Sequence, residues 1–360
     1  STQPSARQVS PLTGGRWMTD TLILDISPKY RAEFACAENL IDAAASHRGI
    51  DITPAFRHGW NFGYLPVAMR LKATSFGRSI FTSRDGQSFN GDFLRSLKDE
   101  CGIDIQLHAN CLANHFRDIV ETEVKAGRPV IVGMDSFDCA WHKCFEKYHN
   151  IHYVLAIGVQ GDAELLIIDD SLASDDGTYV LDERPPYLTL DIAQVLPESF
   201  GFATFRFGKA AREARADRVL YDAALKTLVG SGGSSDFVRM RQLAEELKST
   251  LDIVSEVRMA PDPWGVDLAR IFFGLAFARE HLCEYIDTLD NSGLQEAEIA
   301  TTGLRDAASI WRSMGLFVMK NWDTPDNETP NILGRSVHRA VDLEEKLALE
   351  LVDRLCLRVR

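Results

Sequence analysis

The chain has 360 residues, of which 45% are hydrophobic and 25% charged, so its composition excludes a largely disordered or collagen-like protein. Its net charge of −13 gives no overall electrostatic support for binding nucleic acid or an anionic membrane. No apolar run reaches the about 18 residues of a membrane-spanning helix. Seven cysteines in so long a chain favour reduced thiols in the cytoplasm over a disulfide framework.

The N-terminal region contains a leader and the first ordered elements. Residues 1–18, rich in Ser, Pro, Gly and Gln, lack the apolar centre of a secretory signal, and we predict a flexible leader. The run 21–26 predicts a strand, and the helix formers of residues 35–48, followed by Gly49, predict a helix. Residues 89–125 are typical of mixed, mostly helical structure.

The clearest β signal lies in the middle of the chain. Residues 130–134 form an apolar run, and two further runs, 152–159 and 164–168, flank a Gly-Asp turn. Two apolar runs around such a turn predict a buried hairpin. Residues 179–181 and 200–207 are candidates for further strands.

The pattern changes near residue 208, where helical periodicity takes over. Five Ala- and Leu-rich segments with a period near 3.6 predict helices over 208–229, 236–258, 264–290, 293–321 and 335–357. We therefore expect an α+β domain over residues 19–207 and an all-helical domain over 208–360. The apolar helix faces are core positions first; covering an active-site cleft and forming a homodimer interface are both open as further roles.

One cysteine has the setting of a nucleophile. Cys36 lies at the start of the predicted helix, where the helix dipole and unpaired N–H groups favour a thiolate and can stabilise an oxyanion. His152 begins one strand of the hairpin and Asp169 and Asp170 end the other, so imidazole and carboxylate can meet. Cysteine, histidine and carboxylate in this order are used by papain-like enzymes. A small buried residue at a helix edge is the alternative interpretation of Cys36.

Three segments together resemble the butirosin biosynthesis protein H family. They are residues 35–40 around Cys36, residues 58–64, and residues 127–135 followed by His149, His152 and the aspartate pair. The resemblance covers about residues 30–205. The hairpin is also similar to the His/Asp half of the peptidase domains that process bacteriocin leaders.

This resemblance implies a papain-like fold, with an N-terminal helix packed on an antiparallel sheet, and a helical C-terminal region. It also implies a cysteine acyltransferase of antibiotic biosynthesis that uses no cofactor of its own. Cys36 would take an acyl group from a thioester on a phosphopantetheinylated acyl or peptidyl carrier protein. His152 would relay the proton, and a small-molecule amine, an alcohol or water would accept the acyl group. Open alternatives are a hydrolase or cyclase that releases a polyketide or nonribosomal peptide chain, and a non-catalytic scaffold.

The resemblance ranks the two aspartates and leaves the oxyanion site open. An acidic or amide residue often precedes the orienting aspartate in this family, which favours Asp170 and leaves Asp169 as the alternative. The glutamine that papain-like proteases place before the nucleophile is absent, which disfavours proteolysis. Backbone N–H groups are therefore expected to bind the oxyanion, with Asn39, Asn61 and Tyr64 as candidates for oxyanion or substrate contacts.

A basic stretch stands out in this acidic chain. It consists of Arg70, Lys72, Arg78 and Arg84. A solvated surface is the simpler interpretation. The functional one is docking of an acidic carrier protein or of its phosphopantetheine phosphate.

A second cluster competes for His152. It consists of Cys139, His142, Cys144, His149 and His152. Such a density of Cys and His is compatible with zinc, but the spacing matches no common zinc motif. We favour an aromatic-rich loop that covers a pocket beside the strand, and expect no metal. If zinc bound here, His152 would be a ligand and could not act as a base.

Overall fold

The computed structural model describes residues 21–31, 34–69, 75–82, 91–108, 112–142, 144–147, 149, 151–173, 187–195, 201–210, 215–230, 234–258, 260, 265–289 and 294–359. The leader predicted over residues 1–18 and the candidate strand at 179–181 lie outside these residues. Within the described part, no helix combines the length and the apolar character that a membrane span requires.

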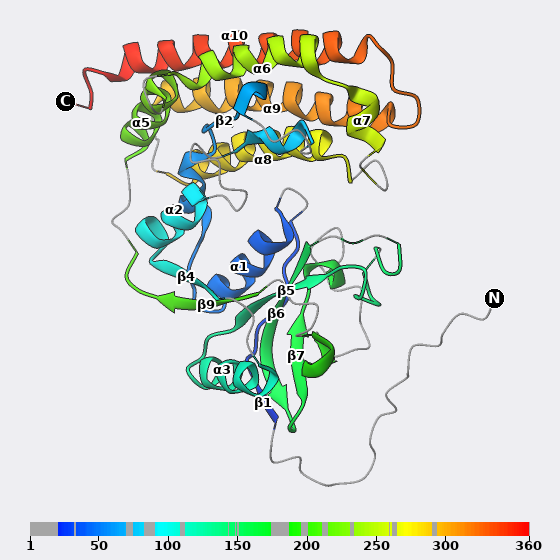
Figure 1. Cartoon of the computed structure of the whole chain (residues 1–360). Helices are drawn as coiled ribbons and strands as arrows, with labels where there is room; N and C mark the ends of the chain where they lie inside the picture. The colour runs from blue at the N-terminus through cyan, green and yellow to red at the C-terminus, as the bar shows by residue number, and fades with distance from the viewer. Residues whose placement is uncertain are drawn as a thin grey trace.

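The front half is built on an antiparallel sheet of seven described strands (Figure 1). The strand order is β4-β9-β5-β6-β7-β8, with β1 pairing to β6 outside this path. The strands are β1 (Thr21–Ile23), β4 (Ile103–His108), β5 (Val130–Asp135), β6 (Ile151–Gln160), β7 (Glu164–Ile168), β8 (Leu188–Asp191) and β9 (Phe202–Phe207). The predicted hairpin is β6–β7, and the α+β class is confirmed.

Helices cover both faces of this sheet. They are α1 (Cys36–Ser46), α2 (Gly91–Cys101), α3 (Ala113–Lys125) and the short α4 (Ile192–Val195). Leu40 and Ile41 of α1 pack in one core with Leu155 of β6. Phe116 of α3 packs in another core with Val154 of β6. Because side chains alternate along a strand, successive residues of β6 contribute to the two cores in turn.

The C-terminal half is a layer of helices beyond α1 (Figure 1). These are α5 (Ala216–Val229), α6 (Asp236–Thr250), α7 (Ile253–Arg258), α8 (Asp267–Thr288), α9 (Gln295–Lys320) and α10 (Thr329–Leu355). The single helix expected over 236–258 is two helices, because Leu251 is extended and the Asp252 carboxylate accepts a new N-terminal hydrogen bond from Ser255 N. Helix α10 begins earlier than predicted because Pro330 is tolerated in its first turn.

The helical core also includes residues from the front of the chain. Between α1 and α2 the chain forms 3-10 turns at Thr53–His58, Val67–Met69 and Gly77–Ser79, and a small sheet of β2 (Gly63–Tyr64) and β3 (Ile80–Phe81). Trp60, Phe62 and Ile80 are buried among the side chains of α5 to α10. Residues ahead of the boundary predicted near 208 therefore share the core of the helical half.

A buried ion pair fastens this early segment to the helices. Arg279 of α8 and Glu344 of α10 are both fully buried, with Nη2 3.0 Å from Oε2. The same carboxylate accepts hydrogen bonds from the indole N–H groups of Trp60 and Trp311, at 2.8 and 2.7 Å. Arg279 also donates to the backbone oxygen atoms of Gly59 and Asn61. The charges are thus fully hydrogen-bonded, as burial requires.

Candidate active site

Cys36 is the first residue of α1, and the local geometry presents its thiol at a helix N-terminus. Ala35 is extended (φ −69°, ψ 156°), and its N–H donates to Glu38 Oε2 at 2.8 Å, which closes half of a capping box. The N–H groups of the first turn have no partner within the helix, so they are available to a negative charge beside Cys36. Cys36 itself is partly exposed, as attack on an external substrate requires.

His152, the second residue of β6, lies beside a carboxylate and near Cys36. Its Nε2 lies 2.7 Å from Asp169 Oδ2. Burial lowers the pKa of His152, but the hydrogen bond with Asp169 and the nearby Cys36 outweigh burial and raise it well above the usual value. The site therefore favours a protonated imidazole beside the Asp169 carboxylate.

Asp169 is held as a carboxylate although it is fully buried. Burial raises the pKa of this group, but the hydrogen bond from His152 and the further donors Trp141 and Ser171 lower it below the ordinary range. Trp141 Nε1 donates to Oδ2 at 2.6 Å, and Ser171 N donates to Oδ1 at 2.8 Å. Both carboxylate oxygens thus have partners, which satisfies the charge in the interior.

A bulge in the hairpin decides which aspartate lies beside His152. Between Ala156 and Gly158 the register of β6 against β7 shifts by one residue. Because side chains alternate between faces, this shift brings Asp169 to the face of His152. Asp170 begins the 3-10 turn that follows, and its carboxylate lies within 4.8 Å of ligand atoms of both His152 and Asp169. An unbroken register would place Asp170 on the face of His152. The structure therefore corrects the preference for Asp170 as the neighbour of the imidazole.

Asp170 lies against helix α1 instead. Asn39 Nδ2 donates to Asp170 Oδ2 at 3.0 Å and also contacts the backbone oxygen of Arg31 at 3.4 Å, while Asn39 Oδ1 accepts from Arg31 N at 2.9 Å. Asn39 is fully buried. Both of its amide hydrogens are directed to protein acceptors, so the structure does not support Asn39 as an oxyanion donor.

Asn61 and Tyr64 lie in other environments. The Asn61 side chain donates to Asp92 of α2 at 2.7 Å, and the Tyr64 hydroxyl donates to Glu246 of α6 at 2.6 Å. Tyr64 is part of the helical core. The structure brings together Cys36, His152 and the two aspartates, but it does not join Asn61 or Tyr64 to them. Backbone N–H groups at the start of α1 stay the expected oxyanion donors.

The loop between β5 and β6 lies against the imidazole. The ring centroid of His142 is 4.5 Å from that of His152, and Trp141 contacts Asp169 through its indole N–H. This agrees with the interpretation of the segment as a covering loop. The hydrogen bond from Trp141 was not predicted from the sequence, although a buried indole N–H usually finds an acceptor.

The Cys and His groups of this loop have separate partners. Cys139 Sγ donates to the backbone oxygen of Asp135, and His149 Nδ1 lies 2.7 Å from the Asp135 carboxylate. Cys144 N donates to His142 Nδ1. We searched the described residues for His, Cys, Asp and Glu side chains that could hold a metal ion together. One group of three has its ligand atoms within 4.8 Å of one another: His152, Asp169 and Asp170. The predicted zinc alternative therefore has no converging Cys/His set in this part of the chain.

The predicted carrier-docking residues are mostly outside the described residues. Arg70, Lys72 and Arg84 fall there. Arg78 is described; its side chain is 70% exposed and its Nε donates to Asp267 at 2.9 Å. A surface pair of this kind leaves the guanidinium accessible to an acidic partner, so docking at Arg78 stays a prediction.

Part of the chain matches a known protein family. Residues 35–171 match the family model described as butirosin biosynthesis protein H, N-terminal. No curated protein matches the chain at a significant level. The matched segment contains Cys36, His152, Asp169 and Asp170, so the family resemblance seen in the sequence is confirmed over the segment that carries these residues.

Proposed function

We propose that this chain, whose residues 35–171 match the family model described as butirosin biosynthesis protein H, N-terminal, is a cysteine acyltransferase of antibiotic biosynthesis with a papain-like catalytic domain. The observation that carries the proposal is the 2.7 Å contact between His152 and Asp169 near Cys36, with the cysteine at a helix N-terminus. A helix that packs on an antiparallel sheet with the histidine near the start of a strand supports the papain-like assignment.

The first half-reaction transfers the acyl group to the enzyme. The Cys36 thiolate attacks the carbonyl carbon of a thioester on a carrier protein, and N–H groups of the first turn of α1 stabilise the oxyanion. Collapse of the tetrahedral intermediate breaks the carbon–sulfur bond to the carrier. The imidazolium of His152 gives its proton to the departing thiolate, which leaves an acyl group on Cys36 and a free carrier thiol.

The second half-reaction delivers the acyl group to an acceptor. Neutral His152 removes a proton from an amine, an alcohol or water as that group attacks the Cys36 thioester. Cys36 leaves as a thiolate and faces a protonated His152 again, so the starting charges are restored. Asp169 keeps the imidazole in one orientation and stabilises its charged form throughout.

The proposal includes the partners expected from the sequence. The donor is an acyl or peptidyl carrier protein, the acceptor is a small molecule, and the enzyme works in the cytoplasm. Because both the enzyme and a typical carrier are acidic, an exposed basic group such as Arg78 is needed at their contact.

The proposal is tested by intact-mass measurement after incubation with an acyl-carrier thioester. We expect a mass increase equal to the acyl group, which disappears in Cys36→Ala and in His152→Ala. His149→Ala, which removes a histidine paired with Asp135, should keep the adduct. Transfer, hydrolysis and cyclisation are then separated by identifying the product. Absence of an adduct with several acyl groups would favour the scaffold alternative.

A further inference from the structure

We propose that Asn39 and Asp170 are positioning residues: together they form a clamp that fixes the start of α1, and with it the Cys36 thiol, against His152 and Asp169. The inference rests on the proposed function, because it assigns the two residues a role at that same site. It replaces the direct roles expected for them, an oxyanion or substrate contact for Asn39 and orientation of the imidazole for Asp170.

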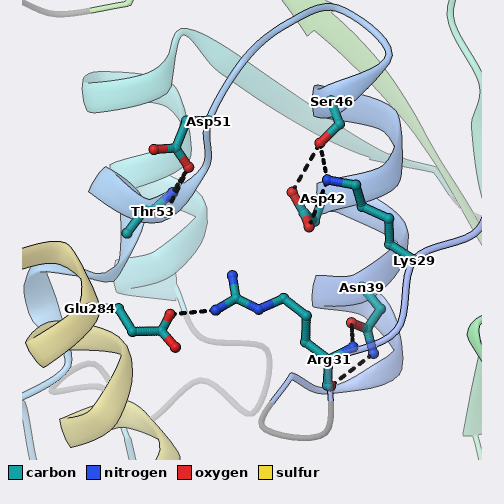
Figure 2. Close-up of polar contacts among 8 residues, drawn as sticks. All are labelled: Lys29, Arg31, Asn39, Asp42, Ser46, Asp51, Thr53 and Glu284. Atoms are coloured by element: carbon teal, nitrogen blue, oxygen red, sulfur yellow. Dashed lines mark hydrogen bonds and ion pairs between the residues drawn. The ribbon is translucent and has the colours of Figure 1, made fainter. Parts of the chain in front are cut away.

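Asn39 connects three parts of the chain in a buried position. It lies one helical turn after Cys36. Hydrogen bonds to Asn39 therefore hold the turn of the helix that carries the thiol. The carbonyl oxygen of Asn39 accepts from Arg31 N, and its amide nitrogen reaches both Arg31 O and Asp170 (Figure 2 shows the two contacts with Arg31). The amide therefore pins the helix start between the preceding segment and the end of the hairpin.

The segment that contains Arg31 is itself fastened. Lys29 Nζ lies 3.3 Å from Asp42 and 2.5 Å from Ser46, both on α1 (Figure 2). Arg31 Nη2 lies 2.6 Å from Glu284 Oε2 of α8. These contacts hold the segment ahead of Cys36 against α1 and against the helical half. The backbone of Arg31, to which Asn39 hydrogen-bonds, is therefore held in place.

Asp170 forms the other side of the clamp. It directly follows Asp169, is 7% exposed, and accepts a hydrogen bond from Asn39. Burial, and then the charge of Asp169, raise the pKa of Asp170 to about 6. In this position the carboxyl of Asp170 accepts the hydrogen bond from the Asn39 amide.

The test exchanges the two side chains. In Asn39→Asp two carboxylates face each other, and we expect alkylation of Cys36 by iodoacetamide at pH 6 to slow about 10- to 100-fold. Asp170→Asn keeps an acceptor for Asn39 and should stay within about threefold of wild type. The exchanged variant N39D/D170N restores one donor and one acceptor, so it should recover the rate lost in Asn39→Asp.

The readout is the ratio of the Cys36 alkylation rates at pH 6 and pH 9, each measured by intact mass. Thermal unfolding of each variant is measured alongside. A thiolate paired with an imidazolium reacts at both pH values, whereas an unassisted thiol loses about tenfold in thiolate per pH unit below about 8.5. Glu123→Gln is the control, because Glu123 is a buried carboxylate on α3 bound to Arg128 and Arg206. It should lower stability and leave the ratio unchanged.

Each outcome decides something. If wild type itself shows the ratio of an ordinary thiol, the proposed function fails. If wild type has the raised ratio and Asn39→Asp keeps it, the clamp is refuted while the proposed function stands. If Asp170→Asn lowers the ratio of the alkylation rates at pH 6 and pH 9 as much as Asp169→Asn does, Asp170 acts through its charge on the imidazole and is not a positioning residue. Recovery in the exchanged variant supports the clamp even where the single variant is less stable.

Discussion

Trp141 and His152 donate to the same oxygen atom of Asp169, at 2.6 and 2.7 Å. The indole comes from the loop between β5 and β6 and the imidazole from β6, so the carboxylate joins the loop to β6. Two donors on one oxygen lower the negative charge available to each, and they also fix the position of that oxygen.

Replacement of this indole tests how much the loop contributes. Trp141→Phe keeps an aromatic ring and removes the N–H group, so we expect acylation to slow about tenfold through a looser Asp169. The measurement is the single-turnover rate of adduct formation on Cys36. An unchanged rate would mean that His152 and Ser171 alone hold the carboxylate.

The bulge predicts unequal effects for the two aspartates. Asp169→Asn removes the charge that supports the imidazolium, and acylation should fall about 10³-fold or more, as for other triad carboxylates. Asp170→Asn should change the same rate only a few-fold. The comparison uses matched substitutions at neighbouring positions, and equal losses would contradict the assignment.

The His152–Asp169 pair also predicts a pH window for stability. The pKa of His152 is raised, so its contribution is complete below the unfolded value of about 6.5 and is lost as pH rises through the folded pKa. The pKa of Asp169 is lowered, so its contribution is present above about 3.9 and is lost as pH falls through the folded pKa.

The unfolding free energy of wild type should therefore exceed that of Asp169→Asn by the greatest amount between about pH 4 and pH 7. Urea unfolding at a series of pH values measures this difference. A difference that stays constant from pH 3 to pH 10 would show that the pair is not ionised in the folded protein.

The buried pair of Arg279 and Glu344 predicts a large loss of stability. Glu344→Gln leaves Arg279 charged and unpaired in the interior, and this should cost about 3–5 kcal/mol of unfolding free energy. Asp287→Asn removes one partner of an exposed pair on the same helix and should cost less than about 1 kcal/mol. Chemical denaturation of both variants checks the contrast.

Much of the fold follows from local sequence patterns. The two apolar runs 152–159 and 164–168 around a Gly-Asp turn predict the hairpin, because strands buried on both faces are continuously apolar. The helical periodicity after residue 208 predicts the helices, because each helix has one buried face. The break between α6 and α7 at Leu251 depends on Asp252, which caps the start of α7. The local sequence favours this cap only slightly over one continuous helix. Helix α10 begins at Thr329, ahead of the predicted residue 335, because Pro330 fits the first turn of a helix.

Sequence predicts those site residues whose role follows from their place at the start of a helix or strand. Cys36 at a helix start and His152 at a strand start are visible from sequence. The choice of Asp169 depends on a one-residue bulge, for which Gly158 is the only local signal; a Cβ there would lie 2.4 Å from Leu22 O. The surroundings of Tyr64 depend on Glu246, a partner far along the chain, which local patterns do not reveal.

The early segment that packs among the C-terminal helices has a consequence for synthesis. Trp60 is synthesised well before Glu344, which accepts its indole N–H. During that interval, the apolar side chains around Trp60 lack part of the core in which they are buried. The nascent chain therefore exposes an aggregation-prone surface until α10 emerges, so the synthesis of α10 governs when this core can close.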